Sequence, residues 1–291
     1  MKQGRIHFQA PFQKFTSLLS QGIKKFYKDF NSLNKSSSKA HIHRLRVSTR
    51  RLRALLSIYK KCRLKPELAS LRSDIKSLTQ ALGPLRSWDV TLSLLKTCLA
   101  RTRPAMQRSL KFVVAELQSA RKKIRNRFQK KHFAKIRRHA AEATQALPSK
   151  SGSVPFSTLL LKQSQKAKKR AEGALRHYRE QEALRPLHEF RIQLKKWRYL
   201  REIEAACLDN PPAATLASMK TLQDYLGETH DLEVLHQALQ TPALRRKAGK
   251  QAQKDLQSFS DRLESEVAAR CSAFLKANRR VLAEIFEDKA S

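Results

Sequence analysis

The sequence contains few residues that interrupt helices and few acidic residues. Its 291 residues include only 7 glycines and 10 prolines, and alternating strand patterns are absent. Acidic residues number 24 against 61 lysines and arginines, which gives a formal net charge of +37. A charge of this size predicts a polyanionic partner, such as nucleic acid, an acidic membrane surface or another polyphosphate.

Cysteines and long apolar runs are also scarce. The four cysteines form no C-x-x-C pair and no zinc spacing, which favours a reducing interior over a disulfide scaffold. No apolar run approaches the roughly 18 residues of a membrane span. The first segment, "MKQGRIHFQAPFQKF", lacks the apolar core of a secretory signal. We therefore expect a cytoplasmic protein with no membrane span.

Helical periodicity is the main pattern that the sequence does contain. Apolar residues recur at spacings of three and four nearly everywhere, which predicts amphipathic helices and an all-α fold. Breaks between about ten helices are expected where glycine, proline and serine occur. These positions are Ser36–Lys39, Pro66, Gly83–Pro84, Pro104, Pro148–Pro155, Pro186, Pro211–Pro212, Gly227 and Pro242.

The pattern occurs twice along the chain. "HRLRVSTRRLRALL" has a relative in "HEFRIQLKKWRYL", and "LTQALGPLRSWDV" has a relative in "LQDYLGETHDLEV", each offset by 144 or 145 residues. This repetition predicts two antiparallel helical bundles of about four to five helices each, related by internal duplication and a pseudo-two-fold axis. The expected parts are a first bundle at 1–147, a linker at 148–155 and a second bundle at 156–291.

The two halves differ in charge. Residues 1–145 hold 35 lysines and arginines against 6 acidic residues, whereas residues 146–291 hold 26 against 18. We therefore expect the first half to dominate the electrostatic field of the protein.

Each repeat carries a row of cations on one helix face. At about 100° per residue, the members of a row fall within an arc of about 80°, roughly opposite the apolar residues of the same helix. We call the rows the first and second cation ladders: His43, Arg46, Arg50 and Arg53, and His188, Arg191, Lys195 and Arg198. Arginine offers a planar fork and lysine a point charge, so both ladders suit phosphoryl oxygens. Lys24 and Lys168 are added to the candidate site from the repeat alone.

These motifs resemble the CHAD domain, a helical domain named for its histidines. The resemblance rests on both ladder motifs and on the "LG" segments "ALGPLRSWDV" and "YLGETHDLEV", and it covers residues 12–288. It implies two four-helix bundles, a basic groove lined by both ladders, and binding of inorganic polyphosphate, which would place the protein at polyphosphate granules. The sequence departs from the family at Ser87, where an aspartate usually follows the arginine. Glu202 lies one turn beyond Arg198 and is expected to pair with it.

Binding of RNA or DNA without sequence specificity is the main alternative, because phosphate contacts alone do not distinguish polyanions. Base recognition should add exposed aromatic or polar side chains. Trp197 lies on an apolar face, and Trp88 is expected in the core. The basic run "RKKIRNRFQKKHFAKIRRH" would suit either ligand or a solvated helix face. A solvated face is also the alternative for the ladders themselves.

We expect no catalysis, no cofactor and no metal site. The chain has no G-x-x-x-x-G-K-[ST] loop for a nucleotide, and acidic residues beside the ladders are too few for a magnesium site. His41 and His43 point to different faces of a helix, and His132 and His139 are expected to be surface neighbours. A cationic environment would also repel a metal ion. The sequence leaves the oligomeric state open.

Overall fold

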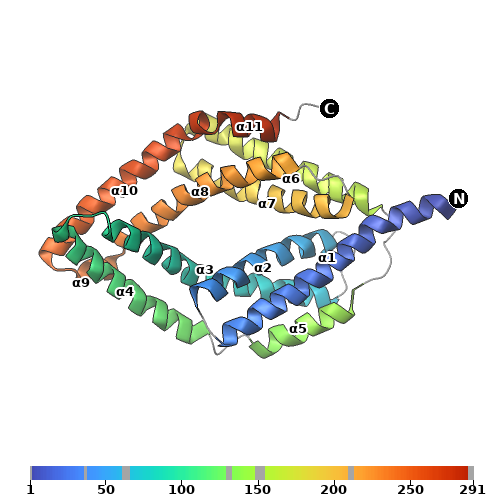
Figure 1. Cartoon of the computed structure of the whole chain (residues 1–291), viewed down its shortest axis with the longest axis horizontal. Helices are drawn as coiled ribbons and strands as arrows, with labels where there is room; N and C mark the ends of the chain where they lie inside the picture. Colours follow the sequence, from blue (N-terminus) through green and yellow to red (C-terminus); the bar gives the residue numbers. More distant parts are fainter. Residues whose placement is uncertain are drawn as a thin grey trace.

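The computed structural model describes residues 2–35, 38–60, 66–128, 133–147, 155–208 and 213–287, and every regular element within these ranges is a helix (Figure 1). The prediction of an all-α fold is confirmed. The helices are α1 (Lys2–Lys35), α2 (Lys39–Tyr59), α3 (Pro66–Leu99), α4 (Pro104–Phe128), α5 (Phe133–Gln145), α6 (Phe156–Gln181), α7 (Leu184–Leu208), α8 (Ala213–Leu239), α9 (Pro242–Lys247), α10 (Lys250–Ala277) and α11 (Arg279–Phe286). None of these described helices is long and apolar enough to cross a membrane.

Both halves of the chain use the same order of helix packing. In the first half, α2 packs against α1 and α3, and α3 packs against α4 and α5. In the second half, α7 packs against α6 and α8, and α8 packs against α10 and α11. The helices that hold equivalent places in this order are also the ones that the offset of 144 or 145 residues relates, so that α2 corresponds to α7 and α3 to α8. The ladder helices α2 and α7 lie side by side where the two halves meet (Figure 1).

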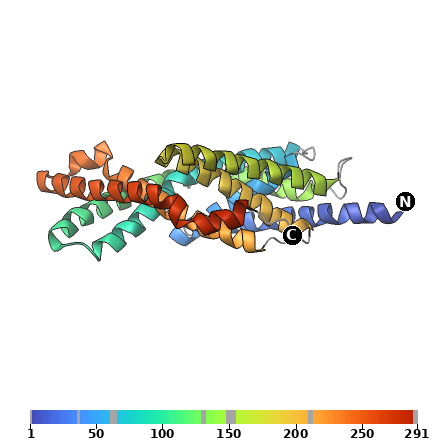
Figure 2. The ribbon, with the colours of Figure 1, turned by 90° about the horizontal axis from the view of Figure 1, so that it is seen from above.

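Three apolar clusters hold the helices together, and the third contains several residues from each half. The first is built mainly from α1, α2, α3 and α5, and the second mainly from α6, α7, α8, α10 and α11. The third joins Leu95 and Leu110 of the first half to Leu235 and Phe259 of the second. The elongated shape in Figure 2 has α4 and α9 at one end, where this shared cluster lies. Residues 148–154 lie outside the described part, so the linker at 148–155 stays a prediction.

The way α2 begins and packs explains why its ladder faces away from the core. Ser38 has an extended backbone, and its Oγ accepts a hydrogen bond from the His41 amide at 3.3 Å, which caps the helix. The buried side chains of Leu52 and Leu55 pack toward α1 at Gly22, where a Cβ would lie 3.0 Å from Leu55 Cδ1. The missing side chain therefore allows a close approach of the two helices. Because the leucines fix the apolar face inward, the ladder is on the other side.

Two of the predicted helix breaks are wrong. The helix α3 continues through Gly83 and Pro84, and α8 continues through Gly227. A proline inside a helix removes a backbone hydrogen bond and costs about 3 kcal/mol. Leu82 and Leu85 on either side are buried, and their packing offsets this cost. The unbroken helices hold the residues that follow these positions in fixed places beside the ladders.

Candidate functional site

The two cation ladders face each other between α2 and α7. Burial, together with the charges of Arg191 on its own helix and of Arg50 and Arg46 on α2, lowers the pKa of Lys195 to about 7. Burial also lowers the pKa of Arg191, and the charge of Arg50 acts in the same direction. Such effects between charges require short separations in a partly buried setting. The two rows therefore form one cationic region, which we call the ladder site.

The first ladder shows the same crowding of positive charge. Burial, together with the charges of Arg50 and Arg86, lowers the pKa of Arg46 to about 10. Burial followed by the charges of Arg86, Arg50 and Arg46 lowers the pKa of His43. Because Arg86 belongs to α3, a third helix contributes to the ladder site. Each protonated group here raises the free energy of its protonated neighbours.

Several guanidinium groups in the ladder site have hydrogen-bonding capacity left over. The Nε atoms of Arg50, Arg191 and Arg198 are buried and have no hydrogen-bond partner among the described residues. A buried donor without a partner costs about 1–3 kcal/mol. A planar guanidinium can also give two parallel hydrogen bonds to a phosphate or carboxylate. The ladder site therefore presents donors that an anionic ligand would satisfy.

The helix α8 brings a histidine and two carboxylates beside the second ladder. The ring centroids of His188 and His230 are 4.8 Å apart, and His230 Nδ1 lies 3.2 Å from Glu233 Oε2. Burial raises the pKa of Asp231, and the positive charges of His230, Arg191, Arg86 and Lys195 oppose this rise. The second ladder is therefore partly neutralised from α8.

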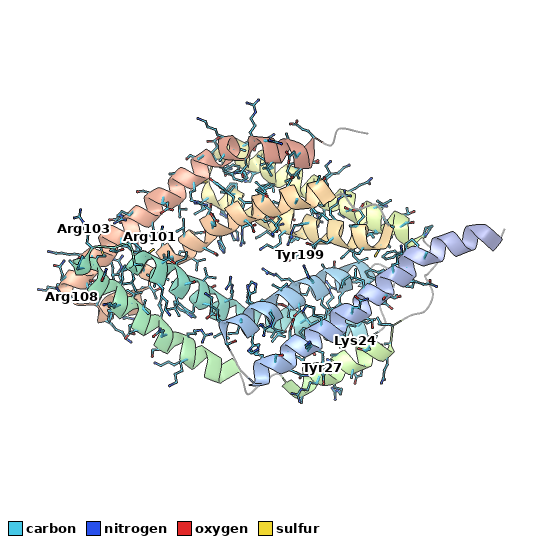
Figure 3. The ribbon with its side chains drawn as sticks, viewed as in Figure 1. Lys24, Tyr27, Arg101, Arg103, Arg108 and Tyr199 are labelled. Carbon is cyan, nitrogen blue, oxygen red and sulfur yellow. The ribbon has the colours of Figure 1, made fainter. Side chains whose placement is uncertain are left out.

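The end of the second ladder is paired as expected. Arg198 Nη1 lies 2.9 Å from Glu202 Oε1, which confirms the predicted ion pair. The Arg198 guanidinium also lies 5.4 Å from the ring centroid of Tyr199. Figure 3 shows Tyr199 on the side of α7 that faces α2. After burial and the nearer arginines, the charge of Arg198 also lowers the pKa of Lys195, so this arginine belongs to the ladder site.

Three candidate residues lie outside this cluster. Arg53 is exposed on α2 beyond Arg50, and its part in binding stays a prediction. Lys168 on α6 has its Nζ 5.9 Å from the ring centroid of the buried Trp197, on the face of α7 away from the ladder. Figure 3 places Lys24 on α1 near α5, on the side of the first half away from α7. The repeat relates Lys24 and Lys168 in sequence, but helix packing turns both away from the ladder site.

The residues that α3 and α8 contribute were missed by sequence reasoning. They are Arg86, His230, Asp231 and Glu233, and all follow the "LG" pairs of the repeated segments. The repetition of those segments was the signal in the sequence that could have identified these residues. The expected breaks at the glycines hid it, because a break would have left the following residues without a fixed position.

One group in the described part of the chain could hold a metal ion. One ligand atom each of His188, His230 and Glu233 lies within 4.8 Å of the others, and a cavity of about 10 Å³ adjoins them. Two histidines and a carboxylate suit zinc or another transition metal. Burial and then the charge of Arg191 lower the pKa of His230, and that same charge would oppose a metal cation. The sequence did not group these residues, because they belong to two helices.

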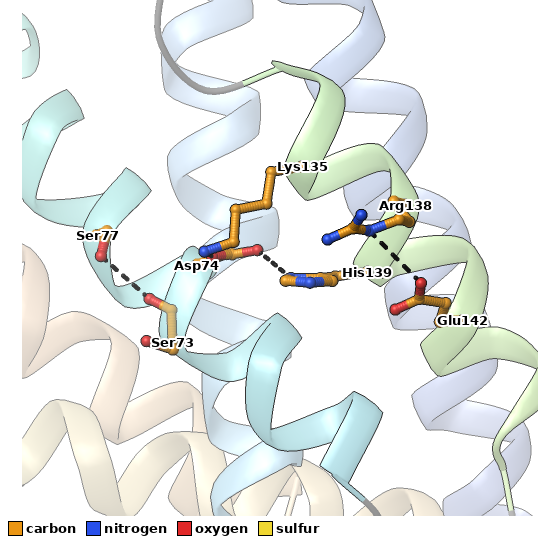
Figure 4. Close-up of polar contacts among 7 residues, drawn as sticks. All are labelled: Ser73, Asp74, Ser77, Lys135, Arg138, His139 and Glu142. Atoms are coloured by element: carbon orange, nitrogen blue, oxygen red, sulfur yellow. Dashed lines mark hydrogen bonds and ion pairs between the residues drawn. The ribbon is translucent and has the colours of Figure 1, made fainter.

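The expectation for His139 is wrong, because this histidine is buried rather than on the surface. Its Nδ1 lies 2.6 Å from Asp74 Oδ2, and Lys135 Nζ lies 3.8 Å from the other oxygen of that carboxylate (Figure 4). These contacts connect α5 to α3, away from the ladder site. His132, its expected neighbour, lies outside the described residues.

Solved structures of other proteins have the same fold as this chain. The chain is similar to the crystal structure of the CHAD domain from the plant Ricinus communis, with a TM-score of 0.70, 22% identity and coverage of 93% of this chain and 90% of that chain. It is also similar to PptA from Streptomyces chartreusis, with a TM-score of 0.67, 16% identity and coverage of 95% and 99%. No curated protein sequence matches. The family model of the CHAD domain matches residues 23–240, most of the chain, and the protein therefore belongs to the CHAD domain family.

Proposed function

We propose that this protein binds inorganic polyphosphate at the ladder site and does not catalyse a reaction on it. The observation that carries the proposal is the facing of two cation rows. Burial, with the charges of Arg191 on its own helix and of Arg50 and Arg46 on the opposite helix, lowers the pKa of Lys195 to about 7. A polyanion between the rows would lower the free energy of these cations and supply acceptors for their donors. Membership of the CHAD domain family supports the same ligand.

The composition of the ladder site favours a phosphate chain without bases. Its donors come from α2, α3 and α7, and the ring of Tyr199 beside it already lies against Arg198. Proteins that bind single-stranded nucleic acid add several free aromatic faces on which bases stack. RNA or DNA is the second candidate, supported by the net charge of +37.

The carboxylates of the ladder site support binding over catalysis. Glu202 pairs with Arg198, and the cations around Glu233 and Asp231, Arg191 among them, would oppose a magnesium ion for phosphoryl transfer. We also place the protein in the cytoplasm, at polyphosphate granules. Two described cysteines support a reducing compartment, since Cys98 and Cys271 are free thiols.

A competition experiment tests the ligand. Labelled polyphosphate bound to the protein is displaced by unlabelled polyphosphate, duplex DNA or single-stranded RNA at matched phosphate concentration and moderate salt. We expect polyphosphate to compete at the lowest concentration. Equal or stronger competition by nucleic acid would favour the second candidate.

A pair of variants with equal charge loss tests the site. Replacing Arg46 and Arg50 by alanine should weaken polyphosphate binding more than about tenfold, because charge-assisted hydrogen bonds contribute about 1.5–3 kcal/mol each. Replacing Arg44 and Arg51 removes the same charge from exposed positions on another face of α2 and should have a much smaller effect. Equal losses in both variants would show that binding depends on net charge and not on the ladder site.

A further inference from the structure

The ladder site contains a half-buried carboxylate on one side that has no counterpart on the other. Asp231 on α8 is the carboxylate, and the offset of 144 residues places Ser87 of α3 at the matching position. Ser87 is exposed, and its Oγ donates a hydrogen bond to the Gly83 carbonyl at 3.3 Å. The repeat therefore carries a negative charge in its second copy and a neutral hydroxyl in its first.

The helix α8 packs against both α7 and α3, so the cations that act on Asp231 come from both halves of the protein. Arg191 and Lys195 lie on α7, Arg86 lies on α3, and His230 precedes it on α8. Glu202 and Glu233 each form a close ion pair on their own helix, and Glu233 also acts on Arg191 of α7. Asp231 is therefore an acidic group that interacts with cations of both halves of the ladder site.

We propose that Asp231 is an internal counter-anion of the ladder site, which shares the cations that would bind phosphate groups and thereby limits the affinity for a polyanion. The inference rests on the proposed function. In the ligand-free protein the carboxylate attracts the surrounding cations, and beside a bound phosphate chain it repels the ligand. Asp231 is half-buried, and the cations around it offset the cost of desolvating its ionised carboxylate.

Two substitutions at matching positions should change the affinity in opposite directions. Asp231→Asn keeps the shape of the side chain and removes its charge, and we expect polyphosphate binding at neutral pH to strengthen by about tenfold, since a like charge beside the ligand is lost. Ser87→Asp adds the charge to the first copy and should weaken binding. The control is Glu228→Gln, which removes a charge from an exposed position on α8 that pairs with Arg270. Its effect should stay below about twofold.

A second readout needs no ligand. The interaction between Asp231 and Lys195 acts equally on both groups, so Asp231→Asn should lower the pKa of Lys195 below about 7. The side-chain carbon resonance of Lys195, followed by NMR over a pH series, measures this. A purely structural role would have the opposite signature, because a loosened α8 would expose Lys195, raise its pKa and weaken binding.

The two readouts separate the possible failures. If the unaltered protein does not bind polyphosphate, the proposed function fails and the inference about affinity fails with it. If it binds but Asp231→Asn leaves the affinity unchanged or weaker, the inference alone is overturned. A titration of Lys195 that is unchanged or moves upward in Asp231→Asn overturns the assignment of Asp231 as the counter-anion, with or without a ligand.

Discussion

Replacing Lys195 by methionine should stabilise the ligand-free protein at neutral pH. Burial, with the charges of Arg191, Arg50 and Arg46, lowers the pKa of Lys195 from 10.5 to about 7. Between these two values the unfolded chain binds a proton that the folded protein does not bind. The contribution of Lys195 to stability therefore rises as the pH increases through this range and is least favourable at and below about pH 7. Methionine has a similar length and no charge, so the substitution removes this unfavourable contribution of Lys195 to stability.

The size of the effect follows from the depressed pKa of Lys195. A fall from 10.5 to about 7 sets an upper value of about 5 kcal/mol, at about 1.36 kcal/mol per pKa unit. Movement of the long side chain toward solvent reduces this value. We therefore expect Lys195→Met to raise the free energy of unfolding by about 1–3 kcal/mol at neutral pH, with the gain shrinking as the pH approaches 10.5.

Urea unfolding followed by the helical circular dichroism signal measures this difference at intervals between about pH 6 and pH 10. The control is Lys196→Met, because Lys196 is exposed and its Nζ has only a 3.3 Å contact with Gln193 Oε1. Its effect should stay within about 0.5 kcal/mol at every pH. If the difference between Lys195→Met and the unaltered protein does not vary with pH, Lys195 is not crowded by cations and the two ladders do not face each other.

Three further predictions concern binding. Alanine at Arg46 and Arg50 should reduce the affinity for polyphosphate more than alanine at Arg191 and Lys195, because α8 partly neutralises the second ladder; equal losses in parallel titrations would contradict this asymmetry. The affinity should increase as the pH falls from about 8 to 6, beyond the effect of phosphate's own titration, because the lowered pKa values of Lys195 and His43 rise again beside a polyanion. A flat profile across this range would exclude both groups. Binding should also weaken steeply with added salt as counterions are released, and calorimetry showing little salt dependence would rule out a multivalent ionic contact.

Local periodicity was sufficient to predict which residues of each ladder helix are buried. Leu45 and Leu52 in α2 and Phe190 and Leu194 in α7 are all in the core, on the faces opposite their ladders. The prediction succeeds because a helix places residues three and four apart on one face, whatever packs against it.

Local signals were not sufficient to predict where the helices end. Gly83, Pro84 and Gly227 were expected to interrupt helices, yet α3 and α8 continue through them. The preference of glycine or proline against a helix amounts to about 1–3 kcal/mol per residue, and core packing on both sides outweighs it. Because of these expected breaks, Arg86 and Asp231 were left out of the predicted site.

The sequence by itself determined the all-α fold, the alignment of each cation row along one helix face, and the excess of positive charge. Only the tertiary structure decided that the two faces meet, that α3 and α8 bring Arg86 and Asp231 to the same region, and that Lys24 and Lys168 lie elsewhere. The physical reason is that the strength of a charge interaction depends on distance and burial. For α2 and α7, which are far apart in the chain, both are set by the packing of the helices around them.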